Sequence, residues 1–271
     1  MADHFEPFRR IIEADGTIAG GVSSDTARRE VADWTRNYRR VYSGISDSDN
    51  MTPRHTFFYP AEEYDPGCVD LLGELCGSGL GEVEVQVHHR NDTGAGLRRR
   101  LQEFRDVLHE KHGMLGLDGA GRVSYGFVHG NWALCNSRPD GDWCGVDREL
   151  SVLKETGCYS DFTFPAVPSP CQPRMVNALY RAEDRDGPRG HDYGRRISVM
   201  GRNKNGLPII QGPLCLDWGR RKFGFLPRIE TGELAGHNVP SPRRVDLWAK
   251  QHISVEGMPE WVFVKVHTHG L

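Results

Sequence analysis

Helix-like and strand-like patterns alternate along most of the chain. Apolar residues recur at helical spacing from Ala27 to Tyr38, which predicts an amphipathic helix over residues 24–42. The run Glu82–His88 alternates polar and apolar residues, as a half-buried strand does. The same reasoning predicts further helices near 68–76, 93–112, 146–156, 173–182 and 242–252, and strands near 54–59, 123–129, 158–164, 196–201, 207–211 and 261–267.

Regular alternation of strands and helices implies a parallel sheet, and this many units favour a closed or nearly closed (β/α) barrel. We therefore expect an α/β fold, a seven-stranded TIM-like barrel in one domain over residues 1–271, with a long loop insertion at about 183–240. An open doubly wound sheet is the alternative. It is less favoured because no glycine-rich phosphate loop follows any strand.

Composition narrows the class of protein. The 271 residues carry a formal net charge of −3, so no basic field indicates nucleic acid as a partner. No run approaches ~18 consecutive apolar residues and no leader pattern opens the chain, so we expect no membrane partner and a cytoplasmic location. The seven cysteines contain no CxxC pair, which argues against both a disulfide framework and a zinc ribbon.

Four chemically capable side chains fall at or near the ends of predicted strands: His88, His129, Asp161 and His267. In a (β/α) barrel the carboxyl ends of the strands meet on one face, where active sites lie. Residues His88 and Asp92 flank a strand-to-helix turn, so they can share a divalent cation such as Zn²⁺. The simpler interpretation makes Asp92 a helix cap.

A substrate surface is predicted in the loop that follows the strand ending at His129. Tryptophan faces stack on sugar rings, while amide, acid and guanidinium groups bind hydroxyls, so such a loop suits a glycan. The alternative is a loop held by tryptophan packing and Asx turns. The predicted substrate-binding residues are His129, Trp132, Asn136, Arg138, Asp161 and Glu63.

Five segments together resemble a known family: HTFFYPAEEY, EVEVQVHHRNDT, YGFVHGNWAL, GCYSDFTFP and FVKVHTHG. They are similar to the glycoside hydrolase/deacetylase superfamily, and within it to a divergent branch of the polysaccharide deacetylases (NodB-homology proteins). The resemblance implies Asp3 as catalytic base and His267 or His269 as general acid. It also implies a zinc ion bound by His4, His88 and Asp92, although Asp92 stands where the family has a second histidine.

The implied activity is metal-dependent removal of acetyl groups from a polysaccharide or an N-acetylated sugar. Two alternatives stay open. One is a glycosidase with paired carboxylates among Glu63, Asp92 and Asp161, and the other is a barrel that binds glycan without catalysis. Family members have more chain before the first motif and after the last one, so we expect this chain to be truncated at both ends, with the barrel open at Asp3.

Overall fold

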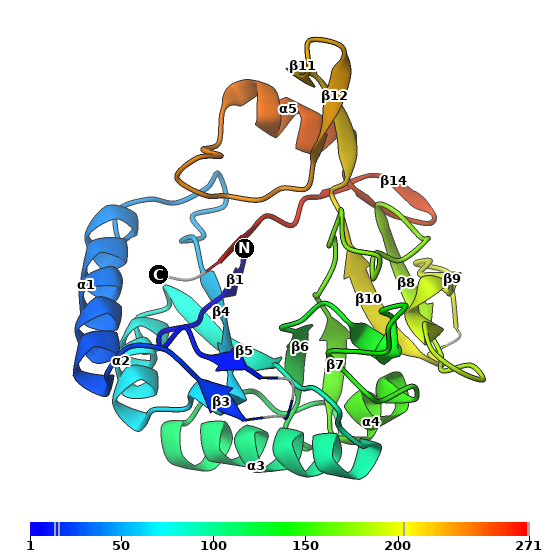
Figure 1. The fold of residues 1–271 in the computed structure, drawn as a ribbon. Helices are drawn as coiled ribbons and strands as arrows, with labels where there is room; N and C mark the ends of the chain where they lie inside the picture. The colour runs from blue at the N-terminus through cyan, green and yellow to red at the C-terminus, as the bar shows by residue number, and fades with distance from the viewer. Residues whose placement is uncertain (14, 16, 203, 270–271) are drawn as a thin grey trace.

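The computed structural model describes residues 1–13, 15, 17–202 and 204–269 of the chain. Its centre is an 11-stranded, mostly parallel sheet (Figure 1). Seven parallel strands are neighbours in the order β10-β7-β6-β5-β4-β1-β15. Their bounds are β1 (Ala2–His4), β4 (His55–Pro60), β5 (Gly81–Val87), β6 (Tyr125–His129), β7 (Cys158–Asp161), β10 (Leu207–Gln211) and β15 (His267–His269).

The sheet continues beyond β10 through strands that the sequence pattern did not predict correctly. The helix expected near 173–182 is wrong, since residues 178–182 form β8 (Ala178–Ala182), antiparallel to β10. The strands that lie near the predicted segments 196–201 and 207–211 do not pair with each other, because β9 and β10 both pair with β8. The other strands here are β9 (Arg195–Arg196), β13 (Ile253–Val255) and β14 (Met258–Phe263).

The sheet is not closed, since no ladder joins β15 to β10 among the described residues. Part of this gap is spanned by Lys265, whose Nζ donates to the carbonyls of Phe162, Phe164 and Ile210. An isolated bridge from Glu233 to His267 lies along the same edge. The barrel was expected to be open at Asp3. This prediction is wrong, because β1 pairs with a strand on both sides and the gap lies between β15 and β10.

Helices cover the outer face of the sheet (Figure 1). Side chains of Ser23, Asp65 and Thr93 accept hydrogen bonds at three helix N-termini, as caps do. Apolar residues of these helices pack on the valines of β5 in one core cluster. The helices are α1 (Ser24–Tyr42), α2 (Pro66–Gly77), α3 (Gly94–His112) and α4 (Glu149–Glu155), with short 3₁₀ turns η1 (Ala61–Glu63), η2 (Leu134–Asn136) and η3 (Gly190–Asp192).

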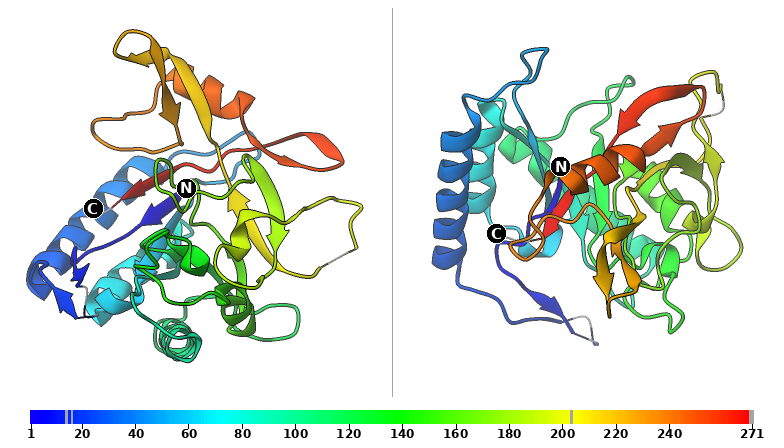
Figure 2. Two further views of the ribbon diagram at one scale, coloured as in Figure 1. Left: turned by 45° about the vertical axis from the view of Figure 1, so that its right-hand side comes forward. Right: turned by 90° about the horizontal axis from the view of Figure 1, so that it is seen from above.

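A small lobe projects from the sheet in Figures 1 and 2. It joins the hairpin of β11 (Cys215–Lys222) and β12 (Leu226–Glu230) to α5 (Pro242–Lys250). The buried guanidinium of Arg244 binds both carboxylate oxygens of Glu230, at 2.8 and 2.7 Å, and so holds helix to hairpin. A second hairpin joins β2 (Ile11–Ile12) to β3 (Ile18–Ala19). No helix in the described part of the chain has the length and apolarity to cross a bilayer.

Candidate functional site

Polar side chains gather where the parallel strands β15, β1 and β5 end, with β4 lying between β1 and β5. We call them the mouth group: His4, Glu6, Gln86, His88 and His269. Successive residues of a strand point to opposite faces, so Gln86 and His88 share the inner face of β5. The valines that alternate with them pack against the helices. The pairing register of β1 and β15 places His269 directly beside His4.

Close contacts join the mouth group in two parts, His4 with His269 and Gln86 with Glu6 and His88. The ring centroids of His4 and His269 are 4.6 Å apart, and the ring of Trp132 lies edge-on to His269 at 6.0 Å. Gln86 Nε2 donates to Glu6 Oε1 at 2.9 Å. Burial keeps the pKa of His4 well below its ordinary value, so this imidazole is neutral and free to act as a ligand.

His88 has the most constrained position in the mouth group. Its Nδ1 contacts the carboxylate of Glu62, and its Nε2 faces Glu6 Oε1 at 3.3 Å. Burial lowers the pKa of His88, but the charges of Glu62 and Glu6 outweigh this effect and raise the pKa to about 10. A Cβ atom at Gly130 would lie 2.2 Å from His88 Nε2, so a glycine is needed there. Two carboxylates flank the ring of His88, so a positive charge is favoured at this position.

Beneath the mouth group the inner face becomes apolar. Ala2, Phe58 and Val128 form a buried cluster there, with Phe162 packed against it. This layer separates the mouth from Glu84, which lies four residues before His88 on the same face of β5. The mouth group is therefore a polar layer that lies next to a buried apolar layer.

A second polar group lies on the other side of β5. His89, His129, Cys144 and Glu149 are buried, and their ligand atoms lie within 4.8 Å of one another, so they could hold a metal ion. Burial lowers the pKa of His129 to about 3 and of His89 to about 4, and it raises the pKa of Glu149. We call these four residues the buried group.

The sequence-predicted catalytic and metal residues divide between these places. His4, His88 and His269 meet at the mouth, with the ring of His267 5.8 Å from that of His269. Asp3 instead contacts His55 Nε2 at 2.8 Å. Asp92 approaches His89 Nδ1 at 3.6 Å, so the structure pairs this acid with the neighbour of His88.

Among the predicted substrate residues, Trp132 is the one that lies beside the mouth group. Side chains of the 136–142 loop have local partners: Asn136 donates to Asp147, and Arg138 binds Asp140. Asp161 accepts from Thr163, and Glu63 accepts from the backbone N–H groups of Phe8 and Arg10. His129 belongs to the buried group.

Six participating residues were not predicted from the sequence. One signal was available, since alternation along β5 already separates His88 from His89 and groups Gln86 with His88. The predicted acid was Glu63, but the structure brings its neighbour Glu62 to the mouth instead. The missed residues are Glu6, Glu62 and Gln86 at the mouth, and His89, Cys144 and Glu149 in the buried group.

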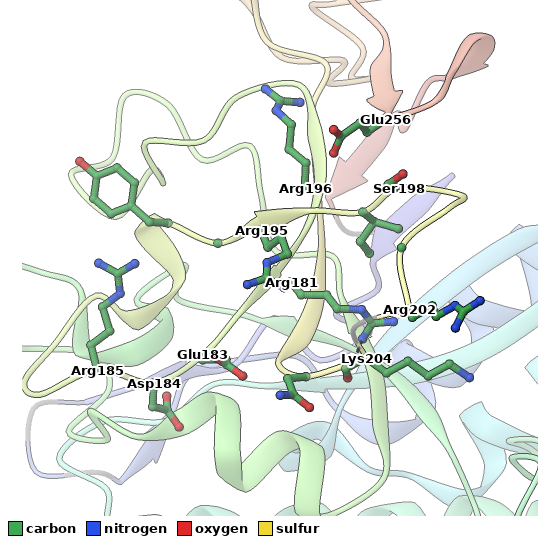
Figure 3. A pocket seen from close by; sticks show the side chains of 15 residues that line it. Arg181, Glu183, Asp184, Arg185, Arg195, Arg196, Ser198, Arg202, Lys204 and Glu256 are labelled. Carbon is green, nitrogen blue, oxygen red and sulfur yellow. Dashed lines mark hydrogen bonds between the residues drawn. The ribbon is translucent and has the colours of Figure 1, made fainter.

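A cleft of about 940 Å³ lies elsewhere, around β8 and β9 (Figure 3). Cationic side chains outnumber acidic ones on its walls, and this excess favours anionic ligands over neutral sugars. It does not match the substrate site expected from the sequence. Its charged lining residues are Arg181, Arg185, Arg195, Arg196, Arg202, Lys204, Glu183, Asp184 and Glu256.

No protein-family model, curated protein or solved structure matches this chain. The resemblance to polysaccharide deacetylases therefore has no support from such comparisons. The chain is a mixed α/β protein with a large, mostly parallel sheet and a buried group of two histidines, a cysteine and a glutamate.

Proposed function

We propose that the mouth group is the active site of a metal-dependent hydrolase that removes acetyl groups from a polysaccharide or an N-acetylated sugar. One observation carries the proposal: Glu62 holds Nδ1 of His88 and leaves Nε2 facing Glu6. Metal-binding histidines almost always donate their second ring N–H to a carboxylate or carbonyl, which fixes the tautomer and aims the other nitrogen.

The neighbouring donors suit a divalent ion. His88 Nε2 and Glu6 Oε1 are 3.3 Å apart, and two ligands on a tetrahedral zinc ion are separated by about 3.3 Å. We expect the third donor to be the neutral ring of His4. Such an ion would polarise a carbonyl group and acidify a bound water. Nitrogen and oxygen donors together make Zn²⁺ the first candidate.

In this proposal His269 is the residue that transfers the proton. Its side chain is exposed and lies between His4 and Trp132, so a substrate can reach it. Histidine is the side chain used most often to accept and donate protons in catalysis. The indole of Trp132 offers an apolar surface to a sugar ring. Asp3 has no part in this scheme, since it faces His55.

The test measures acetate released from N-acetylated oligosaccharides. We expect release by the wild type, loss of release with a chelator, and recovery with added Zn²⁺. His88→Ala should abolish release, and Glu62→Gln should lower the rate by about 10- to 100-fold, as loss of the carboxylate partner of a metal-binding histidine does. His237→Ala, which changes an exposed histidine outside the mouth group, should retain the wild-type rate.

Two outcomes would overturn the proposal. Acetate release that is unchanged by chelator and by His88→Ala would place the chemistry elsewhere. New reducing ends without acetate would show a glycosidase instead of a deacetylase.

A further inference from the structure

The buried group has the composition and spacing of a closed zinc site. We propose that His89, His129, Cys144 and Glu149 bind a structural Zn²⁺ ion, distinct from any ion at the mouth. The chemistry suits this ion, because imidazole nitrogen, thiolate sulfur and carboxylate oxygen are its usual ligands.

The distances agree with tetrahedral coordination. Glu149 Oε1 lies 3.1 Å from His89 Nε2 and 3.9 Å from His129 Nε2, and Cys144 Sγ lies 3.4 Å from Glu149 Oε2. Ligands at zinc bond lengths of about 2.0 to 2.3 Å are separated by about 3.3 to 3.6 Å. One ion can therefore reach all four residues with small adjustments of the side chains.

Unsatisfied polar atoms point to a missing partner. His129 Nε2 is buried and has no hydrogen-bond partner among the described residues. Burying such an atom costs free energy unless a ligand satisfies it. The Asn131 N–H lies 3.2 Å from His129 Nδ1. Binding of an ion at Nε2 places the ring proton on Nδ1, so this contact must open when the site is loaded.

Neighbouring residues orient two of the four proposed ligands, His89 and Glu149. Asp92 Oδ2 lies 3.6 Å from His89 Nδ1, the carboxylate–histidine arrangement common around zinc. The Cys135 N–H donates to Glu149 Oε2 at 2.7 Å and orients the carboxylate, whose Oε1 faces the two histidines. A thiolate and a carboxylate together balance the charge of a divalent ion.

Burial makes this ion structural rather than catalytic. All four ligands are buried and all come from the protein, whereas catalytic zinc keeps a position open for water. The ligands lie on the turn after β5, on β6, on the 144–148 loop and on α4. An ion would cross-link these segments, and since His89 follows His88 directly, it would also fix the turn that aims His88 into the mouth.

Cobalt substitution tests the proposal, because Co²⁺ bound to a thiolate gives a charge-transfer band in the near ultraviolet, and the mouth group offers no sulfur. Cobalt-loaded wild type should show this band and bind the ion stoichiometrically. The band should disappear in Cys144→Ala and persist in His88→Ala. It should also persist in Cys171→Ala, which removes another buried free cysteine. Chelation should lower the melting temperature of the wild type and of His88→Ala.

The result that would overturn the proposal is a cobalt-loaded wild type without the thiolate band, which needs no variant to fold. A band of wild-type strength in Cys144→Ala would also overturn it. If Cys144→Ala does not fold, Glu149→Gln is the second variant that tests the same site. Failure of the deacetylase proposal is distinguishable, since it concerns acetate release and the His88→Ala variant, whereas this site concerns the cobalt spectrum and Cys144.

Discussion

Burial of Glu84 should make the stability of the protein depend on pH. Glu84 lies on the inner face of β5, where Tyr159 Oη donates to its Oε1 at 2.7 Å and the Gly126 N–H donates to its Oε2. Burial raises the pKa of Glu84 from 4.5 to about 7. The folded protein therefore holds this proton more tightly than the unfolded chain does.

The sign and the size follow from linkage. Because the pKa is higher in the folded state, the stabilising contribution is complete below about pH 4.5 and is lost as pH rises through about 7. At about 1.4 kcal/mol per pH unit, the difference amounts to about 3 kcal/mol. Glu84→Gln removes the titration, and its amide can accept from Gly126 and donate to Tyr159.

Urea unfolding from pH 4.5 to pH 8 checks this prediction. The free energy of unfolding should fall with pH more steeply in the wild type than in Glu84→Gln, and the variant should be more stable at pH 8. Glu82→Gln, two residues earlier on the same strand but exposed, is the matched control and should follow the wild type. Parallel curves for wild type and Glu84→Gln would refute the reasoning.

Three further changes test other parts of the structure. Glu230→Gln should destabilise the lobe by about 3–5 kcal/mol, because it leaves the buried guanidinium of Arg244 without its charge partner, and proteolysis should then cut the lobe faster. Lys265→Met should lower the free energy of unfolding by several times the ~1 kcal/mol that one hydrogen bond typically contributes, since three carbonyls lose their donor. An unchanged urea midpoint would contradict this. Gly130→Ala should displace the ring of His88, so metal affinity at the mouth should fall while the melting temperature changes little.

Much of the fold could be predicted from local patterns. The predicted helix at 24–42 matches α1, and Ser23 caps it through Thr26 N. The helix predicted near 93–112 matches α3, and Gly113 ends it with a positive φ of 64°, a conformation that glycine adopts readily. These features depend on neighbours within a few positions, so the sequence alone determines them.

Other parts depended on contacts that local patterns do not contain. Residues 178–182 form a strand because β10 and β13 pair with them on either side. The single strand expected at 261–267 divides into β14 and β15, since β14 turns back onto β13 while β15 joins β1. Pairing with distant strands decided both cases, over any local preference.

The sequence by itself determined which residue types stand at the strand ends, and therefore that His4, His88 and His269 could do chemistry. Tertiary structure decided their partners. Gln86 meets Glu6 across 80 positions, and His89 meets Glu149 across 60. His88 and His89 belong to different groups because alternate residues of a strand face opposite sides of the sheet. The order of the strands determines which residues each histidine meets on its side.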